Sequence, residues 1–507
     1  MHTKRLFTVV ALGLALTLTA LVALSPSPEV ARAASKEWFV EAGGTGGDCS
    51  QANPCALQTA LAQAVGADTV YAAQGTYTGT GAAVITVTES VILYGGWDGT
   101  TATPPVRDPD AYVTTLDGER QRRVIYISSG ISPTIDGFII TGGNGTGLGG
   151  GFINSSDAAG GIYSDGAAPI IQNNIITNNV ASTQTDVRAF GGGIYISAAP
   201  TPAIVRQNQI LSNTAGVGIH LGDGGGLFFH GPIQILSNTF RGNAACVACG
   251  QANGGGVEAG WTEASAGARI AYNLFEDNWA DYGGGVDIVW SAVEVSGNTL
   301  IDNQAARGGG IYGYYDKGSF INANRIISNT AYFGGGVGIY ISLPSFTTLT
   351  NNVLSQNQAN IGGGMYAWSD WHIAVITLTH NTVVDNGVGV LVGNHMTATL
   401  INNIFVSHTL AISRTDTGSK VTVDDTLFWA NDDDGLQGTN PVDGDPAFVS
   451  SNSGDYHIGP GSAALDAGLD AGVLTDIDGD TRPIGLGFDI GADEFCRKVH
   501  LPLVLRN

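Results

Sequence analysis

Two carboxylic acids, Glu258 and Asp287, occupy the same place in a phrase that the sequence repeats. Each lies four residues after the first glycine of a Gly-Gly-Gly triplet. If the repeats stack as β-coils, strand spacing places their Cα atoms about 5 Å apart, which is near the carboxyl separation of retaining glycosidases. Repulsion between the two acids would raise one pKa, as a proton donor requires. Glu258 and Asp287 are therefore the candidate catalytic pair; the alternatives are a cation site or two solvated charges that point apart.

Aromatic residues gather around the same place in the repeats. Because strand faces alternate, the position after an inward-pointing residue should face out of the coil. Sugar rings stack on aromatic side chains, and their hydroxyls need acceptors nearby. The hypothesis is a glycan-binding groove along the coils; the alternative is that the rings pack beneath overlying turns, or are merely residues that favour strands. The candidate ligand-binding residues are Tyr195, Phe228, Trp261, Trp290, Tyr312, Tyr314, Tyr340, Tyr366 and Trp368.

A second acidic motif lies near the end of the chain. Asp476, Asp478 and Asp480 alternate along the sequence, which is the opening spacing of a calcium loop. The later Glu and the sixth-position Gly of an EF-hand are missing, and Arg482 follows closely. The hypothesis is a calcium site, and no other cofactor is expected. The alternative is an Asp-Gly turn whose carboxylates pair with Arg482 and with backbone amides.

The five cysteines fit an oxidising compartment. We expect Cys49 and Cys55 to be joined in the entry loop, and Cys246 and Cys249 to form a local disulfide. The Cys246–Cys249 pair could also bind zinc, but no second ligand pair with zinc spacing follows. Cys496 is left without an assigned partner.

The repeat itself predicts the architecture. The phrase is Asn-x-apolar-x-x-Asn, a short spacer, and Gly-Gly-Gly-apolar, and successive triplets begin 25 to 33 residues apart. Such a period is typical of a solenoid, and short alternating apolar segments favour strands over helices. We expect a parallel β-helix in which one Asn per coil forms a hydrogen-bonded ladder and the glycines supply bends with positive φ. The triplets begin at Gly191, Gly224, Gly254, Gly283, Gly308, Gly334 and Gly362, and the Asn phrases begin at Asn174, Asn208, Asn238, Asn273, Asn298, Asn324, Asn352 and Asn381.

Composition limits the class of protein further. A formal net charge of −23, with only 21 Lys plus Arg, argues against binding to nucleic acid or to an anionic membrane. Residues 1–33 read as a secretory signal: Lys4 and Arg5, an apolar run from Leu6 to Leu24, and a small-x-small site. An uncleaved anchor is the alternative, because the run approaches membrane-spanning length. No second span is predicted, so we expect a secreted or cell-surface protein, and a monomer.

The first part of the mature chain, residues 34–85, predicts a cap and the first strands. Leu57, Leu61 and Ala64 have helical spacing, and an open solenoid end needs such a cover. This part and the next segment resemble secreted right-handed β-helix proteins of the pectate-lyase-like superfamily. The matching residues are Asp68-Thr-Val-Tyr71, Gly75-Thr-Tyr77, Gly95-Gly-Trp-Asp-Gly-Thr100 and Thr115-Leu-Asp-Gly118.

The β-helix is predicted over residues 86–430, and its repeats over about 140–400 are similar to those of polymorphic outer membrane proteins. That family alternates Gly-Gly-Ala-apolar with Phe-x-x-Asn; Phe240-x-x-Asn243 and Phe275-x-x-Asn278 match, while Gly replaces Ala here. Residues 431–495 resemble the choice-of-anchor Q module of secreted bacterial β-helix proteins, and residues 496–507 are a tail. The motifs of that module are Asp445-Pro-Ala-Phe448, Asp455-Tyr-His-Ile458, Gly461 to Gly468, Asp476 to Pro483 and Phe488 to Phe495.

These resemblances imply fold and location more than chemistry. The Gly-His-Gly and Arg-Ile-Lys elements of polygalacturonases are missing from the sequence. Calcium-dependent pectate lyases use a basic residue beside an acidic calcium cluster, and the repeat region here has almost no lysine, with Lys317 as the exception. The favoured interpretation is therefore a surface β-helix that binds an extracellular ligand, a glycan first of all, or acts as an adhesin. A polysaccharide-degrading enzyme that uses carboxylates on the aromatic face is the first alternative. A purely structural surface protein is the second.

Overall fold

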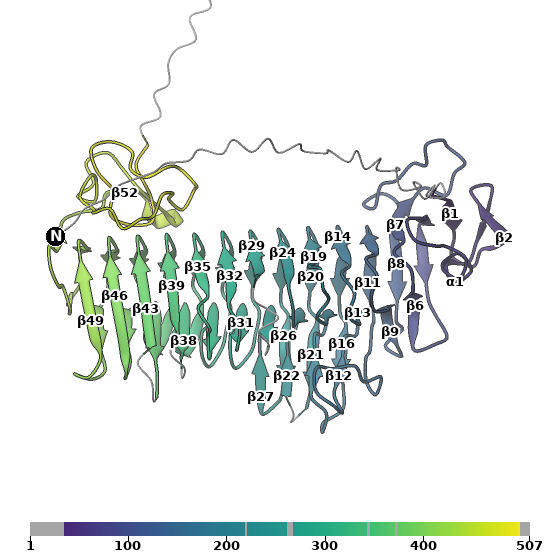
Figure 1. Ribbon diagram of the computed structural model, residues 1–507, viewed down its shortest axis with the longest axis horizontal. Coiled ribbons are helices and arrows are strands. Elements are labelled where there is room, and N and C mark those ends of the chain that lie inside the picture. The colour runs from purple at the N-terminus through teal and green to yellow at the C-terminus, as the bar shows by residue number, and fades with distance from the viewer. Residues whose placement is uncertain (1–34, 219–220, 261–266, 342–344, 371–373, 497–507) are drawn as a thin grey trace, which may run out of the picture. The chain divides into compact units, whose positions relative to one another are not determined.

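Short parallel strands stack coil upon coil in the computed structural model, which describes residues 35–218, 221–260, 267–341, 345–370 and 374–496 (Figure 1). Each coil contributes one strand to each of three long sheets, here called sheets 1, 2 and 3 in chain order. Pairing is parallel throughout these sheets except between β2 and β3. The predicted signal segment and the tail after Cys496 lie outside the described residues.

The bounds of the strands show how regular the coils are. Sheet 1 contains β2 (Thr45–Ser50), β3 (Asn53–Cys55), β1 (Glu37–Val40), β4 (Thr69–Ala73), β7 (Ile92–Trp97), β10 (Thr134–Asp136), β14 (Ile170–Gln172), β19 (Ala203–Arg206), β24 (Ile233–Leu236), β29 (Ala268–Ala271), β32 (Val293–Ser296), β35 (Phe320–Asn322), β39 (Phe346–Thr350), β43 (Ala374–Thr379), β46 (Met396–Ile401) and β49 (Lys420–Asp424). Sheet 2 contains β5 (Gly75–Tyr77), β8 (Thr114–Asp117), β11 (Ile139–Thr141), β15 (Ile175–Thr177), β20 (Gln209–Leu211), β25 (Thr239–Arg241), β30 (Leu274–Glu276), β33 (Thr299–Ile301), β36 (Arg325–Ile327), β40 (Val353–Ser355), β44 (Thr382–Val384), β47 (Ile404–Val406), β50 (Leu427–Trp429) and β51 (Val442–Asp443). Sheet 3 contains β6 (Ala83–Val87), β9 (Arg123–Ile127), β13 (Ile162–Ser164), β18 (Ile194–Ile196), β23 (Leu227–Phe229), β28 (Val257–Gly260), β31 (Val286–Val289), β34 (Ile311–Tyr314), β38 (Val337–Tyr340), β42 (Met365–Trp368), β45 (Val388–Val392) and β48 (Leu410–Arg414).

Between sheets 2 and 3 several coils add strands that the sequence did not predict. Four of them form an outer sheet that consists of β12 (Asp157–Ala158), β17 (Ala189–Phe190), β22 (Leu221–Asp223) and β27 (Gln251–Asn253). A smaller sheet consists of β16 (Val180–Ser182), β21 (Thr214–Val217) and β26 (Ala244–Val247). Later in the chain, β37 (Thr330–Phe333) and β41 (Gln358–Ile361) form a separate two-stranded sheet. The chain therefore reaches the Gly-Gly-Gly bend from outside the coil and then enters sheet 3.

Asparagine ladders hold the bends on the two sides of sheet 2. Asn238 donates from Nδ2 to Asn273 Oδ1 at 3.0 Å, and the backbone N–H of Asn238 donates to the same oxygen at 2.8 Å. Five residues later, Asn243 makes the same pair of bonds to Asn278 Oδ1, both at 3.0 Å. The predicted ladder is confirmed, and it is double, because both Asn residues of each phrase take part.

The glycine triplets are required by crowding as well as by backbone conformation. Gly254 has a φ of 62°, in the left-handed region that favours glycine. A Cβ atom on Gly255 would lie 2.4 Å from the carbonyl oxygen of Gly284 in the next coil. Neighbouring coils therefore touch backbone to backbone at this bend, as the predicted role of the triplets requires.

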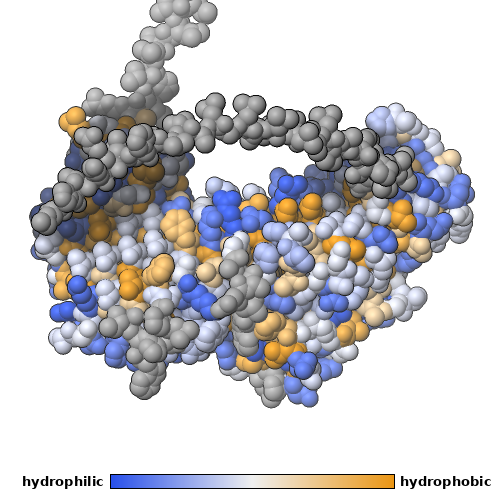
Figure 2. Space-filling model, viewed as in Figure 1, coloured by the Kyte–Doolittle hydropathy of each residue, from blue (hydrophilic) through white to orange (hydrophobic). Residues whose placement is uncertain are grey.

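The core lies between the three long sheets. The residue directly after each triplet is buried there, as predicted: Ile194, Leu227, Val257, Val286, Ile311, Val337 and Met365. Apolar residues elsewhere are scattered among polar ones on the face seen in Figure 2. One continuous core and the Asn ladders therefore hold the coils together.

Both ends of the stack carry added elements. Helix α1 (Leu57–Leu61) is shorter than predicted and buries Leu57 and Ala60 in the core at the first coils. At the other end, the antiparallel pair β52 (Phe448–Ser450) and β53 (Asp455–Ile458), with the 3-10 turn η2 (Ser451–Ser453), belongs to a C-terminal module. Its apolar side chains pack on sheet 2 through Tyr456 and Ile490.

Candidate functional site

The column of side chains that holds Glu258 and Asp287 points away from the core but is not open to solvent. Tyr195, Phe228, Glu258, Asp287 and Tyr312 are between 0% and 2% exposed. The column faces out of the coil, as predicted, but these five residues are covered, which matches the alternative of packing beneath overlying turns. Strand alternation does direct them outward, but the segment that precedes each triplet then lies over them.

The covering residues form a second column in register with the first. Phe190, Asp223 and Asn253 are register partners in the outer sheet, and single bridges continue the column. Rings meet across the two columns: Phe190 lies 4.8 Å from Phe228, and Tyr282 lies 5.4 Å from Tyr312, between ring centroids. The continuing members are Tyr282, Arg307 and Phe333. Sequence reasoning missed this column, although its signal was the varied residue directly before each glycine triplet.

The predicted acid pair exists and has a third member. Glu258 and Asp287 are register partners on β28 and β31, as predicted. Asp223, from the outer sheet, accepts hydrogen bonds from Arg188 Nη2 at 2.9 Å and from Asn253 Nδ2 at 2.6 Å, and Arg188 Nε also donates to it. Within the described residues, no hydrogen-bond partner is found for either carboxyl oxygen of Glu258 or for Asp287 Oδ1.

Burial and like charge determine the protonation of these acids. Burial raises the pKa of Glu258 well above its usual range, the neighbouring acids Asp223 and Asp287 raise it further, and Arg188 opposes them. Burial, and then the charge of Asp223, likewise raises the pKa of Asp287. The neutral carboxyl is therefore favoured at both positions. Arg188 forms its ion pair with Asp223.

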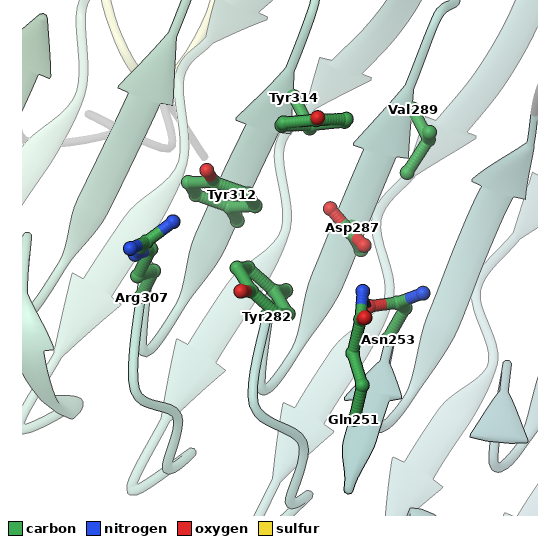
Figure 3. A pocket seen from close by; sticks show the side chains of 8 residues that line it. All are labelled: Gln251, Asn253, Tyr282, Asp287, Val289, Arg307, Tyr312 and Tyr314. Carbon is green, nitrogen blue, oxygen red and sulfur yellow. Dashed lines mark hydrogen bonds between the residues drawn. The ribbon is translucent and has the colours of Figure 1, made fainter. Parts of the chain in front are cut away.

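Beside this cluster lies a pocket of about 240 Å³. Asp287 contributes to it from β31, whereas Glu258 is not among the described lining residues. Figure 3 shows Tyr282, Arg307 and Tyr312 gathered on one side of the pocket, with Asp287 and Asn253 facing them. Its lining consists of Gln251, Asn253, Tyr282, Asp287, Val289, Arg307, Tyr312 and Tyr314.

Arg307 is the pocket's cationic group, and it packs on rings. Its guanidinium carbon lies 5.4 Å from the ring centroid of Tyr282 and 5.5 Å from that of Phe333. No carboxylate lies within ion-pair distance of Arg307 in the described part of the chain. Burial raises the pKa of Tyr312 well above its usual range, so this side chain keeps its hydroxyl proton.

The other predicted aromatic residues fall into three groups. Tyr340 stacks on Tyr314 at 5.5 Å and leads to Trp368, which stacks on Tyr366 at 4.6 Å, so these half-buried rings continue the aromatic surface beyond the pocket. Trp290 joins this surface through Tyr315. Tyr195 and Phe228 belong instead to a separate buried cluster with Tyr163 and Phe190. Trp261 lies outside the described residues.

The candidate calcium residues point in different directions. Asp476 is buried, and its carboxylate accepts backbone N–H groups from Asp478, Asp480 and Glu494. Asp478 instead meets His457 Nε2 at 2.6 Å, and a carboxylate oxygen of Asp493 lies within 4.8 Å of this pair. Asp480 is exposed. The calcium site therefore stays a prediction, and the amide contacts of Asp476 match its alternative, an Asp-Gly turn.

Arg482 completes that turn through a different partner than the one expected. It is buried and donates to Glu494 at 2.8 Å and to the carbonyl oxygen of Gly491 at 2.8 Å. Cys49 is joined to Cys55, and Cys246 to Cys249, in the pairs expected. Cys496 is exposed and forms no disulfide with any described residue.

The three stacked sheets, with the core between them, define a right-handed parallel β-helix. A family model described as "Right handed beta helix region" matches residues 252–405, which include both acids of the pair and most of the pocket. No curated protein sequence matches the chain. None of the described helices is long and apolar enough to cross a membrane.

Solved structures with similar folds are distant. Pectate lyase Pel9A has a TM-score of 0.39 and 12% identity, over 91% of this chain and 96% of that one. XylC, solved with xylose, has a TM-score of 0.37 and 10% identity, over 90% and 98%. The A-module of the mannuronan C-5 epimerase AlgE6 from Azotobacter vinelandii has a TM-score of 0.36 and 14% identity, over 77% and 95%. Likenesses at this level assign no activity to the chain.

Proposed function

We propose that this protein is an extracellular β-helix that binds a glycan in the pocket between β31 and β34. The observation that carries the proposal is the pocket lining: three tyrosines around a neutral polar floor of Asp287, Asn253 and Gln251. Tyrosine rings offer faces to sugar C–H groups, and the polar side chains can exchange hydrogen bonds with hydroxyls. The ring surface through Tyr340 and Trp368 gives further sugars of a chain a place to bind.

A glycan array probed with the full chain tests the proposal. We expect binding to at least one glycan, and loss of that binding in Tyr282→Ala, which removes one wall of the pocket. Tyr272→Ala is the matched control, because Tyr272 is 62% exposed and lies away from the pocket. Equal binding by both variants and the unchanged chain would place the glycan elsewhere, and an array without any signal would reject the proposed function.

Cleavage of the bound glycan is a second candidate, favoured by one observation. Asp287 lines the pocket, and burial raises the pKa of its carboxyl well above the usual range, as a proton donor to a glycosidic oxygen requires. Glu258 lies behind it, so Asp287 is the member of the pair that could touch a sugar. Incubation of an array ligand with the chain, followed by mass spectrometry, should give products that Asp287→Asn does not give. If the ligand stays intact after prolonged incubation, the protein binds the glycan without cleaving it.

A further inference from the structure

A second cavity, of about 630 Å³, lies where the C-terminal module meets the last coils of the stack (Figure 1). We call it the module cleft. One side consists of the residues that directly follow strands β40, β44, β47 and β50, which are Gln356, Asp385, Ser407 and Ala430. The other side is the hairpin of β52 and β53 with the turn before it. The volume of the module cleft falls within the roughly 300–1,000 Å³ of ligand pockets.

The polar side chains of the module cleft are exposed, so a ligand can reach them. Gln356, Asp385 and Ser407 are exposed on the coil side, as are Asp445 and Asn452 on the module side. Asp445 Oδ1 accepts the backbone N–H of the turn at 2.7 Å, which leaves its Oδ2 available. Within the described residues, the other four side chains form no hydrogen bond. The cleft therefore offers carboxylate, amide and hydroxyl groups to a ligand.

Trp429 adds an aromatic face to this polar lining. It is the last residue of β50 and is 40% exposed. Tyr314 and Tyr340 stack on each other, whereas no ring of a described residue packs on Trp429. A free indole face attracts both the C–H groups of a sugar ring and a cation.

Charge restricts the ligands that suit the module cleft. The described residues that line it include the acids Asp385 and Asp445 but no Lys, Arg or His. Residues 421–481, which supply the module side, contain many aspartates and neither lysine nor arginine. A cleft lined by one sign of charge attracts the opposite charge and raises its local concentration. The module cleft therefore favours a cationic ligand and repels one that carries carboxylates or sulfates.

We propose that the module cleft binds a glycan through a sugar that carries a free, protonated amino group. The ammonium would bind Asp385 or Asp445, the C–H face of the ring would stack on Trp429, and hydroxyls would exchange hydrogen bonds with Gln356 and Ser407. A lysine side chain could also meet the carboxylates, but it has no hydroxyls for the amide and hydroxyl groups of the lining. The module cleft is separate from the pocket between β31 and β34, so this inference does not depend on binding at that pocket.

Isothermal titration of the full chain with four probes tests the inference. The probes are chitotriose with three free amines, its triacetylated form, cellotriose and the peptide trilysine. At about pH 5.5 the amines and the exposed carboxylates are both charged. We expect chitotriose to bind about tenfold more tightly than the two neutral sugars, because charge-assisted hydrogen bonds form only with the amine. Trilysine should bind more weakly than chitotriose, and about 0.5 M NaCl should reduce the preference for the amine.

Substitutions at the acids test whether the carboxylates select the amine. Asp385→Asn and Asp445→Asn each remove a charge but keep an acceptor oxygen. Each should lower affinity for chitotriose about fivefold or more, with little change for cellotriose. Asp470→Asn makes the same change at an exposed acid of the module that is not among the lining residues, and it should leave the preference intact.

A substitution at the indole tests the stacking surface. Trp429→Ala should weaken binding of all three sugars. Trp279→Ala is the matched control, because Trp279 is 38% exposed and is not among the residues that line the module cleft. Circular dichroism of each variant shows whether it is folded.

Each other outcome would overturn the inference in a different way. Equal affinity for chitotriose and cellotriose would mean that the amine is not recognised. Trilysine binding as tight as chitotriose would indicate a site for a basic protein segment. Loss of chitotriose binding in Tyr282→Ala but not in Trp429→Ala would place the amino sugar in the pocket between β31 and β34. Absence of binding by every probe would also overturn it, whereas the proposed function is decided separately by the Tyr282→Ala comparison on the glycan array.

Discussion

Glu258 and Asp287 lie side by side, one strand spacing apart, on β28 and β31, and both are buried without a full set of hydrogen-bond partners among the described residues. Two adjacent carboxylates in a dry environment repel each other and lose hydration, so at least one proton stays bound. The nearby Arg188 pairs with Asp223 and compensates that acid first. In the folded protein, at least one of these two carboxyl groups therefore keeps its proton, next to the pocket.

The stability of the protein should fall as the solution becomes more alkaline. For an acid whose folded-state pKa is raised, the folded state holds more protons, so stability declines as pH rises above the unfolded pKa and toward the folded one. The slope is at most about 1.4 kcal/mol per pH unit for each group. We expect the thermal midpoint to decrease from pH 5 to pH 9, and Glu258→Gln to flatten this decrease.

An exposed acid provides the control for this experiment. Asp110 is exposed, and Asp110→Asn makes a comparable loss of one ionisable carboxyl away from the cluster. It should leave the pH profile of the thermal midpoint unchanged. A Glu258→Gln profile that runs parallel to that of the unchanged chain would contradict a proton stored at Glu258.

The acid side of the stability profile should depend on His408. This residue takes the place of an asparagine in the second ladder, since Asn386 N–H donates to its Nδ1 at 3.3 Å and its own N–H donates to Asn431 Oδ1 at 2.9 Å. Burial lowers the pKa of His408 to about 4. The contribution of neutral His408 to the free energy of unfolding is therefore complete above the unfolded pKa near 6.5. It is lost as pH falls toward 4, by up to about 3 kcal/mol.

His408→Asn should remove that loss and continue the ladder with the residue used in the earlier coils. Chemical unfolding at pH 4.5 and pH 7 measures the effect. We expect the variant to gain stability relative to the unchanged chain at pH 4.5. His395→Asn changes an exposed histidine and should show no such gain. If His408→Asn is less stable than the unchanged chain at both pH values, packing of the imidazole ring contributes more stability than the hydrogen bonds of an asparagine would.

The coil architecture could be predicted from the sequence because its causes are local and repeated. Asn238 and Gly254 show their roles by type and spacing alone, since only one amide geometry and one backbone conformation fit the stacked bends. The inward position after each triplet follows from strand alternation, and all seven of those residues are buried. The outer sheet was not predicted, because Leu221–Asp223 and Gln251–Asn253 are too short to show a periodic pattern.

The candidate site was predicted only in part, and the reason is the same outer layer. The alternation of side chains along a strand predicts the direction in which Asp287 points, but it does not predict which segment covers this side chain. Asp223 and Arg307 come from the segment before the glycines, and Arg188 reaches Asp223 from the preceding coil. The triplet register aligns residues at the same position of the phrase, such as Glu258 and Asp287. It gives no signal for side chains at different positions that meet across two coils, such as Arg188 and Asp223.

Contact between coils at the glycine bend predicts a sharp difference between two glycine substitutions. A Cβ on Gly284 would lie 2.5 Å from Gly309 O and 2.7 Å from Gln304 O, which are backbone atoms that cannot rotate away. A Cβ on Gly47 would meet nothing within 4 Å. Gly284→Ala should therefore destabilise the chain by about 3 kcal/mol or more, and Gly47→Ala by much less, in chemical unfolding. Equal effects would contradict backbone contact between the coils.

Arg307 should matter for ligand affinity more than for stability. Its guanidinium lies over Tyr282 and Phe333 at the pocket edge, where it is half-buried and can still bind solvent or ligand. Arg307→Gln should lower affinity for an array-selected glycan about tenfold, because a charged donor is lost, while the thermal midpoint moves by a degree or two.

Arg307→Lys should not restore binding, since an ammonium lacks the planar fork that stacks on rings. Arg206→Gln, a substitution at an exposed arginine on β19, is the matched control. Full restoration by lysine would show that charge alone, rather than the stacked guanidinium, determines affinity at this pocket.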